Sequence, residues 1–125
     1  MDPRLGARVL AAGRVAFGAG LLLAPGAASS RWVGPQQAGR PGVQALLRSI
    51  GVRDIVLGMI ALHTVGHPQV GPRWQATCAA VDAVDTLATV GARSDLPAGG
   101  VVGVGALAGG AALAGLHFAR ALKRG

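Results

Sequence analysis

The sequence predicts an all-α integral membrane protein built as a four-helix bundle. Hydrophobic residues make up 51% of its 125 residues and charged residues only 14%, whereas a soluble domain of this size carries about a quarter charged residues. Apolar segments long enough to cross a membrane also follow one another along the chain, separated by breaks that contain Pro and Gly. We therefore expect a single transmembrane domain over residues 1–125, with helices at approximately 5–24, 43–65, 74–92 and 97–119.

The fourth segment carries the strongest membrane signal. From Leu96 to Ala119 the chain has no Asp, Glu, Lys or Arg, and a segment of that length is sufficient to cross the hydrocarbon core. It contains two glycine pairs with GxxxG spacing, Gly99 with Gly103 and Gly105 with Gly109. Because such pairs let helices approach closely, we expect this helix to serve in helix packing or in contacts with a membrane partner or a second copy of the chain.

The distribution of Lys and Arg predicts the orientation, because positive residues near the ends of a span resist translocation. With the N-terminus inside, six lie on the cytoplasmic side: Arg4, Arg8, Arg73, Arg120, Lys123 and Arg124. Three lie outside: Arg31, Arg40 and Arg93. This bias predicts a multi-pass protein of the bacterial cytoplasmic (inner) membrane, with both termini cytoplasmic.

The N-terminal segment allows a second interpretation. Residues 1–14 resemble the basic region of a signal peptide, residues 15–24 a short apolar region, and residues 24–29 a small-residue cleavage zone. A cleaved signal would leave three helices and remove Arg14. The segment before the apolar region, residues 1–14, is long for the basic region of a signal peptide, and the apolar pattern already begins at Leu5. Both observations favour an uncleaved helix.

Five charged residues are expected at one depth near the middle of the membrane: Arg14, Arg53, Asp54, Asp82 and Asp85. Arg48 precedes Asp54 by about six residues, and at the rise of an α-helix this places it roughly 9 Å nearer the outer face. A charge at the bilayer centre costs about 2.5 to 3.5 kcal/mol on insertion scales, so these residues should be paired. All six are candidates for binding a ligand or a proton, and the alternative is that they are ion pairs that only fix helix register.

Helical spacing predicts which residues share a face with these charges. On the third segment the polar residues follow one stripe: Cys78, Asp82, Asp85 and Thr89. Small residues accompany the charges on the first two segments, as Ala7, Ala11, Arg14 and Gly18, and as Gly51, Asp54, Gly58 and Ala61. Small neighbours allow another helix to come within hydrogen-bonding distance of a charge.

The residues needed for nucleic-acid, metal or dinucleotide binding are missing from the sequence. The net charge is +7, but the Lys and Arg residues are scattered without a basic helix face, which argues against nucleic acid as a partner. His63 and His67 have the spacing of a metal pair, yet the chain contains no Glu and only one Cys. The glycines around Gly103 approximate a dinucleotide fingerprint without the βαβ unit it needs. We therefore predict no metal, no cofactor and no catalytic set.

Three segments carry a resemblance to a known family: Arg14-Val-Ala-Phe-Gly18, then Arg53-Asp54 with Gly58, then Asp82 and Asp85. With these, the chain resembles small bacterial integral membrane proteins of actinobacterial composition and, more distantly, the DoxX-type four-helix proteins. The likeness extends over essentially the whole chain. A DoxX-like relationship implies an inner-membrane protein that is associated with membrane redox partners.

The leading functional hypothesis is a non-enzymatic membrane protein that binds a ligand or a partner, for example as an accessory subunit. The first alternative is a minimal proton-coupled carrier, in which Asp82 and Asp85 share a proton and Arg14 or Arg53 tunes their affinity for it. The second alternative is a membrane-embedded enzyme of the isomerase type, which would use one Asp as acid or base on a lipophilic substrate.

Overall fold

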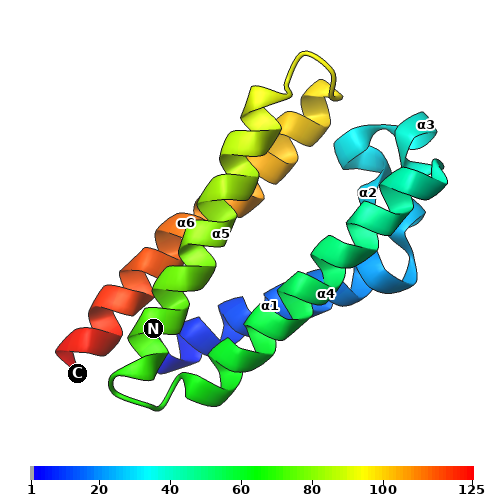
Figure 1. The fold of residues 1–125 in the computed structure, drawn as a ribbon. Helices are drawn as coiled ribbons and strands as arrows, with labels where there is room; N and C mark the ends of the chain where they lie inside the picture. Colours follow the sequence, from blue (N-terminus) through cyan, green and yellow to red (C-terminus); the bar gives the residue numbers. More distant parts are fainter. Residues whose placement is uncertain (1) are drawn as a thin grey trace.

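The computed structural model describes residues 2–125 as a set of helices (Figure 1). In chain order they are α1 (Pro3–Leu23), α2 (Pro25–Val33), α3 (Pro35–Ala38), α4 (Pro41–Thr64), α5 (Val70–Gly91) and α6 (Ala98–Arg124). All regular structure in residues 2–125 is helical, as the composition and hydropathy predict. The four long helices, α1, α4, α5 and α6, overlap the four expected segments, and their ends differ from the expected ones by one to five residues.

The segment between α1 and α4 differs from the expectation because it contains two further helices, α2 and α3. Pro25, Pro35 and Pro41 each stand at the start of a helix, where the missing N–H of proline costs nothing and its fixed φ suits the first turn. Gly34 joins α2 to α3 with a φ of 91°, a conformation that glycine adopts without strain. A proline interpreted only as the end of a helix therefore also begins the next one.

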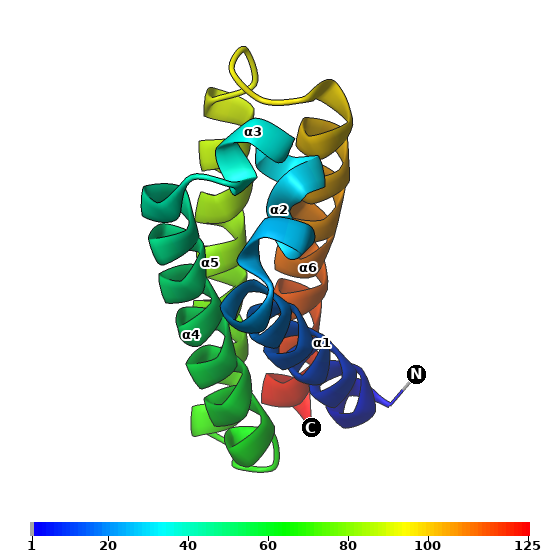
Figure 2. The ribbon, with the colours of Figure 1, turned by 90° about the vertical axis from the view of Figure 1, so that its right-hand side faces the viewer.

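The long helices form two antiparallel pairs, α1 with α4 and α5 with α6 (Figure 1). The two pairs diverge from the end of the molecule that carries both termini and the α4–α5 turn. Figure 2 shows that α2, α3 and the α5–α6 turn lie together at the other end. There α2 contacts α1, α4 and α6 and bridges the two pairs.

Glycines bring α1 and α4 into backbone contact. A Cβ at Gly18 would lie 2.5 Å from the carbonyl oxygen of Gly51, and a Cβ at Gly51 would lie 2.6 Å from the carbonyl oxygen of Gly18. Two turns further along, a Cβ at Gly58 would lie 2.8 Å from the carbonyl oxygen of Ala11. The expected small-residue faces are therefore confirmed, since Ala7, Ala11 and Gly18 of α1 and Gly51, Asp54, Gly58 and Ala61 of α4 are buried.

The molecule exposes large hydrophobic side chains on all four long helices, for example Val9 of α1, Val56 of α4, Leu87 of α5 and Leu113 of α6. The buried hydrophobic core is small by comparison and centres on Ala11, Ala61 and Cys78. Two helices, α1 and α6, are long and apolar enough to cross a membrane. In the most apolar stretch of α6 only 11% of the residues are buried, unlike the core helix of a soluble protein.

The expectation of four membrane spans is met by length and composition for α1 and α6 only. Helices α4 and α5 are of spanning length, but each carries three charged residues. Most of these charges belong to the group expected at mid-membrane depth, so the residues of greatest interest are the ones that lower the hydropathy of both helices.

Replacing Gly18 with alanine should destabilise the fold by about 1 to 3 kcal/mol, because the new methyl group would meet backbone atoms of α4 that cannot move aside. The matched control is Gly13→Ala on the same helix, where an added Cβ meets nothing within 4 Å. The free energy of unfolding, measured by circular dichroism in mixed micelles with increasing sodium dodecyl sulfate, checks this. Equal stability of the two variants would contradict the proposed close contact.

Candidate functional site

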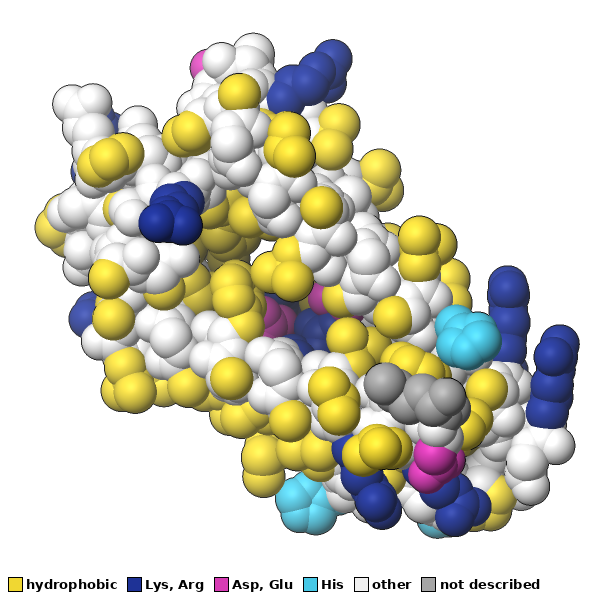
Figure 3. Space-filling view, turned by 180° about the vertical axis from the view of Figure 1, so that it is seen from behind, with side chains coloured by type: hydrophobic (Ala, Val, Ile, Leu, Met, Phe, Trp, Pro, Cys, Tyr) yellow, Lys and Arg dark blue, Asp and Glu magenta, His cyan; other side chains and the backbone are white. Residues whose placement is uncertain are grey.

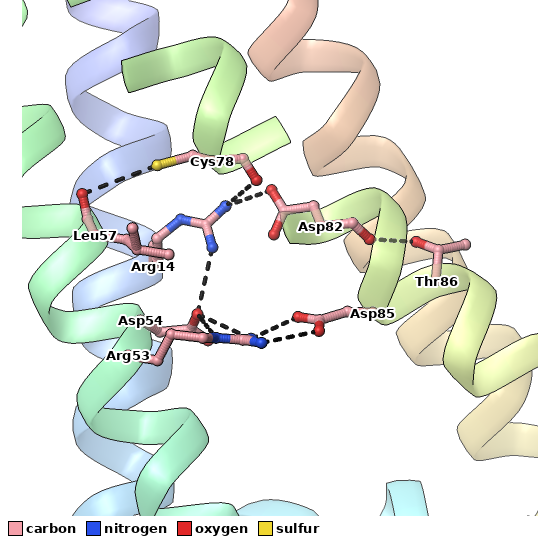
Figure 4. A network of polar contacts seen from close by, with 8 residues as sticks. All are labelled: Arg14, Arg53, Asp54, Leu57, Cys78, Asp82, Asp85 and Thr86. Atoms are coloured by element: carbon pink, nitrogen blue, oxygen red, sulfur yellow. Dashed lines mark hydrogen bonds and ion pairs between the residues drawn. The ribbon is translucent and has the colours of Figure 1, made fainter. Parts of the chain in front are cut away.

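Charged side chains from α1, α4 and α5 meet between the two helix pairs (Figure 4). Arg14 donates from Nη1 to Oδ1 of Asp54 at 3.4 Å and from Nη2 to Oδ2 of Asp82. Arg53 donates from Nε and Nη2 to the same Oδ1 of Asp54 at 3.3 and 3.2 Å. Its two terminal nitrogens also bind the two carboxylate oxygens of Asp85, at 3.2 and 2.7 Å.

Acidic and basic groups alternate along these contacts, in the order Asp82, Arg14, Asp54, Arg53 and Asp85, and we call this set the Arg/Asp network. Each arginine lies between two carboxylates, and Asp54 is shared by both arginines. The network joins α1 and α4 of one helix pair to α5 of the other. The five residues expected at one depth are therefore brought together.

Burial changes along the network. The side chains of Arg14, Asp54 and Asp82 are 8%, 4% and 10% exposed, whereas those of Arg53 and Asp85 are 35% and 24% exposed. The Arg14 end is thus largely buried, and its charges depend on one another for compensation. The Arg53–Asp85 pair has a more open surrounding.

The polar stripe of α5 faces the interior, as its spacing predicts. The carbonyl of Cys78 accepts a hydrogen bond from Nη2 of Arg14 at 3.3 Å. One turn further along, Asp82 binds Arg14, and after a second turn Asp85 binds Arg53. At the far end, Oγ1 of Thr89 accepts a hydrogen bond from the indole N–H of Trp32 at 3.3 Å. Each member of the stripe has a partner on another helix, since the thiol of Cys78 also lies 3.9 Å from the carbonyl oxygen of Leu57.

A cavity of about 300 Å³ lies against the network. Its charged lining consists of Arg14, Asp54, Asp82 and Asp85, and the rest is almost entirely apolar. Figure 3 shows the hollow, with acidic and basic side chains at its floor and hydrophobic side chains around it. This volume is at the lower end of the range for small-molecule sites.

The rim of the cavity is apolar and lies on the side of the bundle, where α1 faces α6. Val9 and Phe17 of α1 and Leu107 of α6 line the cavity and are 60%, 36% and 63% exposed. Gly13 lines it as well, and an added Cβ there meets nothing within 4 Å. On α6 the wall is made partly of small residues, Ala108 and Ala111, which leave the space open.

Helix α2 closes the cavity at the end away from the termini. Trp32 lines the cavity and is held to α5 through its bond to Thr89. The backbone of α2 also packs directly on α6, because a Cβ at Gly100 would fall on the carbonyl oxygens of Arg31 and Trp32. Trp32 was not among the site residues predicted from the sequence.

Arg48 does not join the other candidate residues. It is exposed, and its Nε donates to the carbonyl of Leu22 at 3.3 Å, near the end of α1. Its side chain points to the surface because it lies off the buried face of α4, which holds Leu47, Gly51 and Asp54. We therefore remove Arg48 from the candidate site.

The predicted packing glycines of α6 make few contacts within the chain. A Cβ at Gly99, Gly103 or Gly105 would meet nothing within 4 Å, and one at Gly109 would lie 3.8 Å from Thr86. The close contacts of α6 fall at Gly100, against α2, and at Gly115, where a Cβ would lie 3.1 Å from that of Ala79. The GxxxG spacing thus identified glycines that make no close contact within the described residues, and their use in oligomerisation stays a prediction.

His63 and His67 are engaged with backbone atoms. Nδ1 of His67 accepts hydrogen bonds from the N–H groups of Gln69 and Val70, at the start of α5. Nδ1 of His63 lies 2.7 Å from the carbonyl oxygen of Met59. His67 therefore caps the beginning of α5.

Gln75 extends the polar stripe of α5 by one turn and was not among the predicted residues. It is 2% exposed, and its Nε2 has no hydrogen-bond partner among the described residues. The sequence could have indicated this position, because Gln75 precedes Cys78 by three residues and therefore lies on the same face of the helix.

No family model, curated protein or solved structure matches this chain. The resemblance to DoxX-type proteins accordingly stays a proposal that rests on the residues given above.

Removing Arg14 alone should cost about 3 to 5 kcal/mol in folding free energy, because Arg14→Gln leaves the buried carboxylate of Asp82 without a cation. The double variant Arg14→Gln with Asp82→Asn should recover a substantial part of this loss, since both charges are then absent. The measurement is the free energy of unfolding of the two single variants and the double variant.

The control is Arg53→Gln, which should cost less because Arg53 and its partner Asp85 are more exposed. If the effects of the two single changes simply add in the double variant, Arg14 and Asp82 are not directly paired in the folded protein.

Proposed function

We propose that this chain is a multi-pass membrane protein that binds a lipophilic ligand, whose polar head lies on the Arg/Asp network and whose apolar part fills the cavity between α1 and α6. One observation carries the proposal: a buried ion-pair network forms the floor of an apolar cavity that opens on the side of the bundle. A network that only fixed helix register would need no such space beside it.

The surface supports placement in a membrane. All four long helices expose large hydrophobic side chains, and the buried polar residues, including Asp54, Gln75, Asp82 and Thr89, lie in the interior. This distribution suits a chain surrounded by lipid, in which polar groups must be satisfied inside the protein. The four charged residues in the middle of α4 and α5 are then compatible with spanning, because they pair within the bundle: Arg53, Asp54, Asp82 and Asp85.

The arrangement of the ends agrees with the orientation proposed from the charges. Both termini and the α4–α5 turn lie at one end of the bundle (Figures 1 and 2). This end carries the six residues assigned to the cytoplasmic side, whereas Arg31, Arg40 and Arg93 lie in α2, next to α4 and after α5, toward the other end. We propose the bacterial cytoplasmic membrane, with both termini cytoplasmic.

The side opening favours entry of the ligand from the lipid. Arg14 lies near the middle of α1, and Leu107 and Ala108 lie near the middle of α6, so the opening would be at the depth of the acyl chains. Its exposed rim of Val9, Phe17 and Leu107 is apolar. A molecule dissolved in the bilayer can reach such an opening without crossing water.

The geometry favours ligand binding over the proton-carrier alternative. That alternative needs Asp82 and Asp85 to share a proton, and the two carboxylates are instead bound to different arginines. An enzyme acting on the ligand would occupy the same cavity, and recovery of the ligand unchanged after incubation distinguishes a binding protein from an enzyme.

Topology is tested with single cysteines introduced into a Cys78→Ala background. Ser94→Cys, in the exposed α5–α6 turn, should react with a membrane-impermeant maleimide on intact cells. Gln69→Cys, in the exposed α4–α5 turn, should react only after the cells are permeabilised. Recovery of the protein in the soluble fraction, or labelling of both positions from outside, would contradict the proposed placement.

Ligand binding is tested by filling the cavity. Gly13→Leu should reduce the amount of any co-purifying lipophilic compound at least about tenfold, because the new side chain occupies open cavity space. Compounds are extracted from protein purified in mild detergent and quantified by mass spectrometry.

The matched control is Gly110→Leu, an exposed glycine of α6 outside the cavity with equally open space around it. It should retain the compound. If the Gly13→Leu protein carries the same compounds in the same amounts as the unsubstituted protein, the cavity is not a ligand site.

A further inference from the structure

The cavity has an excess of negative charge. The network contains three carboxylates and two guanidinium groups. Of the arginines only Arg14 lines the cavity, together with Asp54, Asp82 and Asp85, and no other charged side chain of the described residues does so. Arg48, the nearest further cation on α4, is turned away toward the carbonyl of Leu22. The network therefore has one more carboxylate than guanidinium groups, although each carboxylate contacts an arginine.

Asp54 and Asp82, which line the cavity, each have one carboxylate oxygen that accepts no hydrogen bond from the described residues. Asp54 uses Oδ1 for all of its bonds to the arginines, and Asp82 binds Arg14 through Oδ2. Neither Oδ2 of Asp54 nor Oδ1 of Asp82 receives a hydrogen bond among the described residues. Among the described residues, the fully buried side-chain polar atom without a partner is Nε2 of Gln75. The two free carboxylate oxygens are therefore not completely enclosed by protein atoms.

From these two observations we infer that the ligand is a cationic amphiphile, with a protonated amine as its head. The inference rests on the proposed function and adds the chemical class of the ligand. An ammonium group supplies the missing positive charge and offers three N–H donors. Its donors match the free oxygens of Asp54 and Asp82, and the alkyl part fits between the apolar walls of α1 and α6.

Other head groups fit less well. An anionic head would face three carboxylates with a single arginine among them, and Arg14 already directs its two terminal nitrogens to Asp54 and Asp82. A neutral alcohol donates one hydrogen bond but leaves the excess charge uncompensated in a low-dielectric surrounding, where unpaired charge is costly. A quaternary ammonium carries the charge without an N–H donor.

The experiment compares probes of equal chain length, decylamine, decanol, decanoate and decyltrimethylammonium, binding to the full chain in nanodiscs of phosphatidylcholine. Binding is measured at neutral pH by competition with a fluorescent alkylamine. Gly13→Leu protein in the same nanodiscs corrects for partition into the bilayer. We expect decylamine to bind at least about tenfold more tightly than decanol, a ratio in the range of one hydrogen bond to a charged group. Decyltrimethylammonium should be weaker than decylamine, and decanoate the weakest.

Two variants change the net charge of the Arg/Asp network in opposite directions. Asp85→Asn leaves two carboxylates against two arginines and should lower the preference for decylamine over decanol about tenfold. Arg53→Gln, at a side chain that is 35% exposed, leaves three carboxylates against one arginine and should raise it. A purely structural effect on the fold would weaken both probes together and would not move their ratio in opposite directions.

The outcomes separate this inference from the proposed function. If all four probes bind equally and Gly13→Leu abolishes binding, the cavity is a site for lipophilic molecules and the cationic head is wrong. If the probe ratios are the same in Asp85→Asn and Arg53→Gln as in the unsubstituted protein, the inference is also wrong. If Gly13→Leu changes no probe's binding, the cavity is not the site, and both proposals are overturned.

Discussion

Two ion pairs, Arg14 with Asp82 and Arg53 with Asp85, connect helix pairs that contact each other much less than the helices within each pair. Asp54 links the two connections because it accepts from both arginines. The α1–α4 pair is held by glycines in backbone contact, and the α5–α6 pair by small residues such as Gly115 and Ala79. Neither contact orients one pair relative to the other. The Arg/Asp network, together with the bridging helix α2, sets that relation, and the position of the cavity follows from it.

The cavity exists because of the same small residues that permit the packing. With 21 glycines and aromatic residues at only 3%, the chain has few side chains large enough to fill space between diverging helices. Where glycine meets glycine, as at Gly18 and Gly51, the backbones touch. Where Gly13 faces Ala108 and Ala111 across the divergence, the same composition leaves a hollow. One sequence property therefore produces tight contact in one region and open space in another, and the direction in which the helices diverge decides between them.

Much of this arrangement is predictable from single-helix periodicity. The four long helices, the buried faces of α1 and α4, the polar stripe of α5 and the gathering of Arg14, Arg53, Asp54, Asp82 and Asp85 all follow from residue spacing along a helix. Features that depend on how helices are placed relative to one another are not predictable in this way. Which arginine binds which carboxylate, the exclusion of Arg48 and the cavity all require the crossing of α1, α4 and α5. The helices α2 and α3 were missed for a local reason. The proline after the first segment, Pro25, was interpreted only as a break, although proline also suits the first turn of a helix, as at Pro25, Pro35 and Pro41.

The imbalance of charge argues for a role beyond holding helices together. Buried ion pairs can fix helix register, but the desolvation of each charge offsets much of the attraction, so a network adds little stability for its size. Two arginines and two carboxylates would connect α1, α4 and α5 equally well, for instance through Arg14 with Asp82 and Arg53 with Asp85. The third carboxylate, Asp54, is only 3% exposed, accepts from both arginines through one oxygen, and makes the carboxylates of the network outnumber its arginines. A residue that is costly for the fold and directed at an apolar cavity is best explained by what the cavity binds.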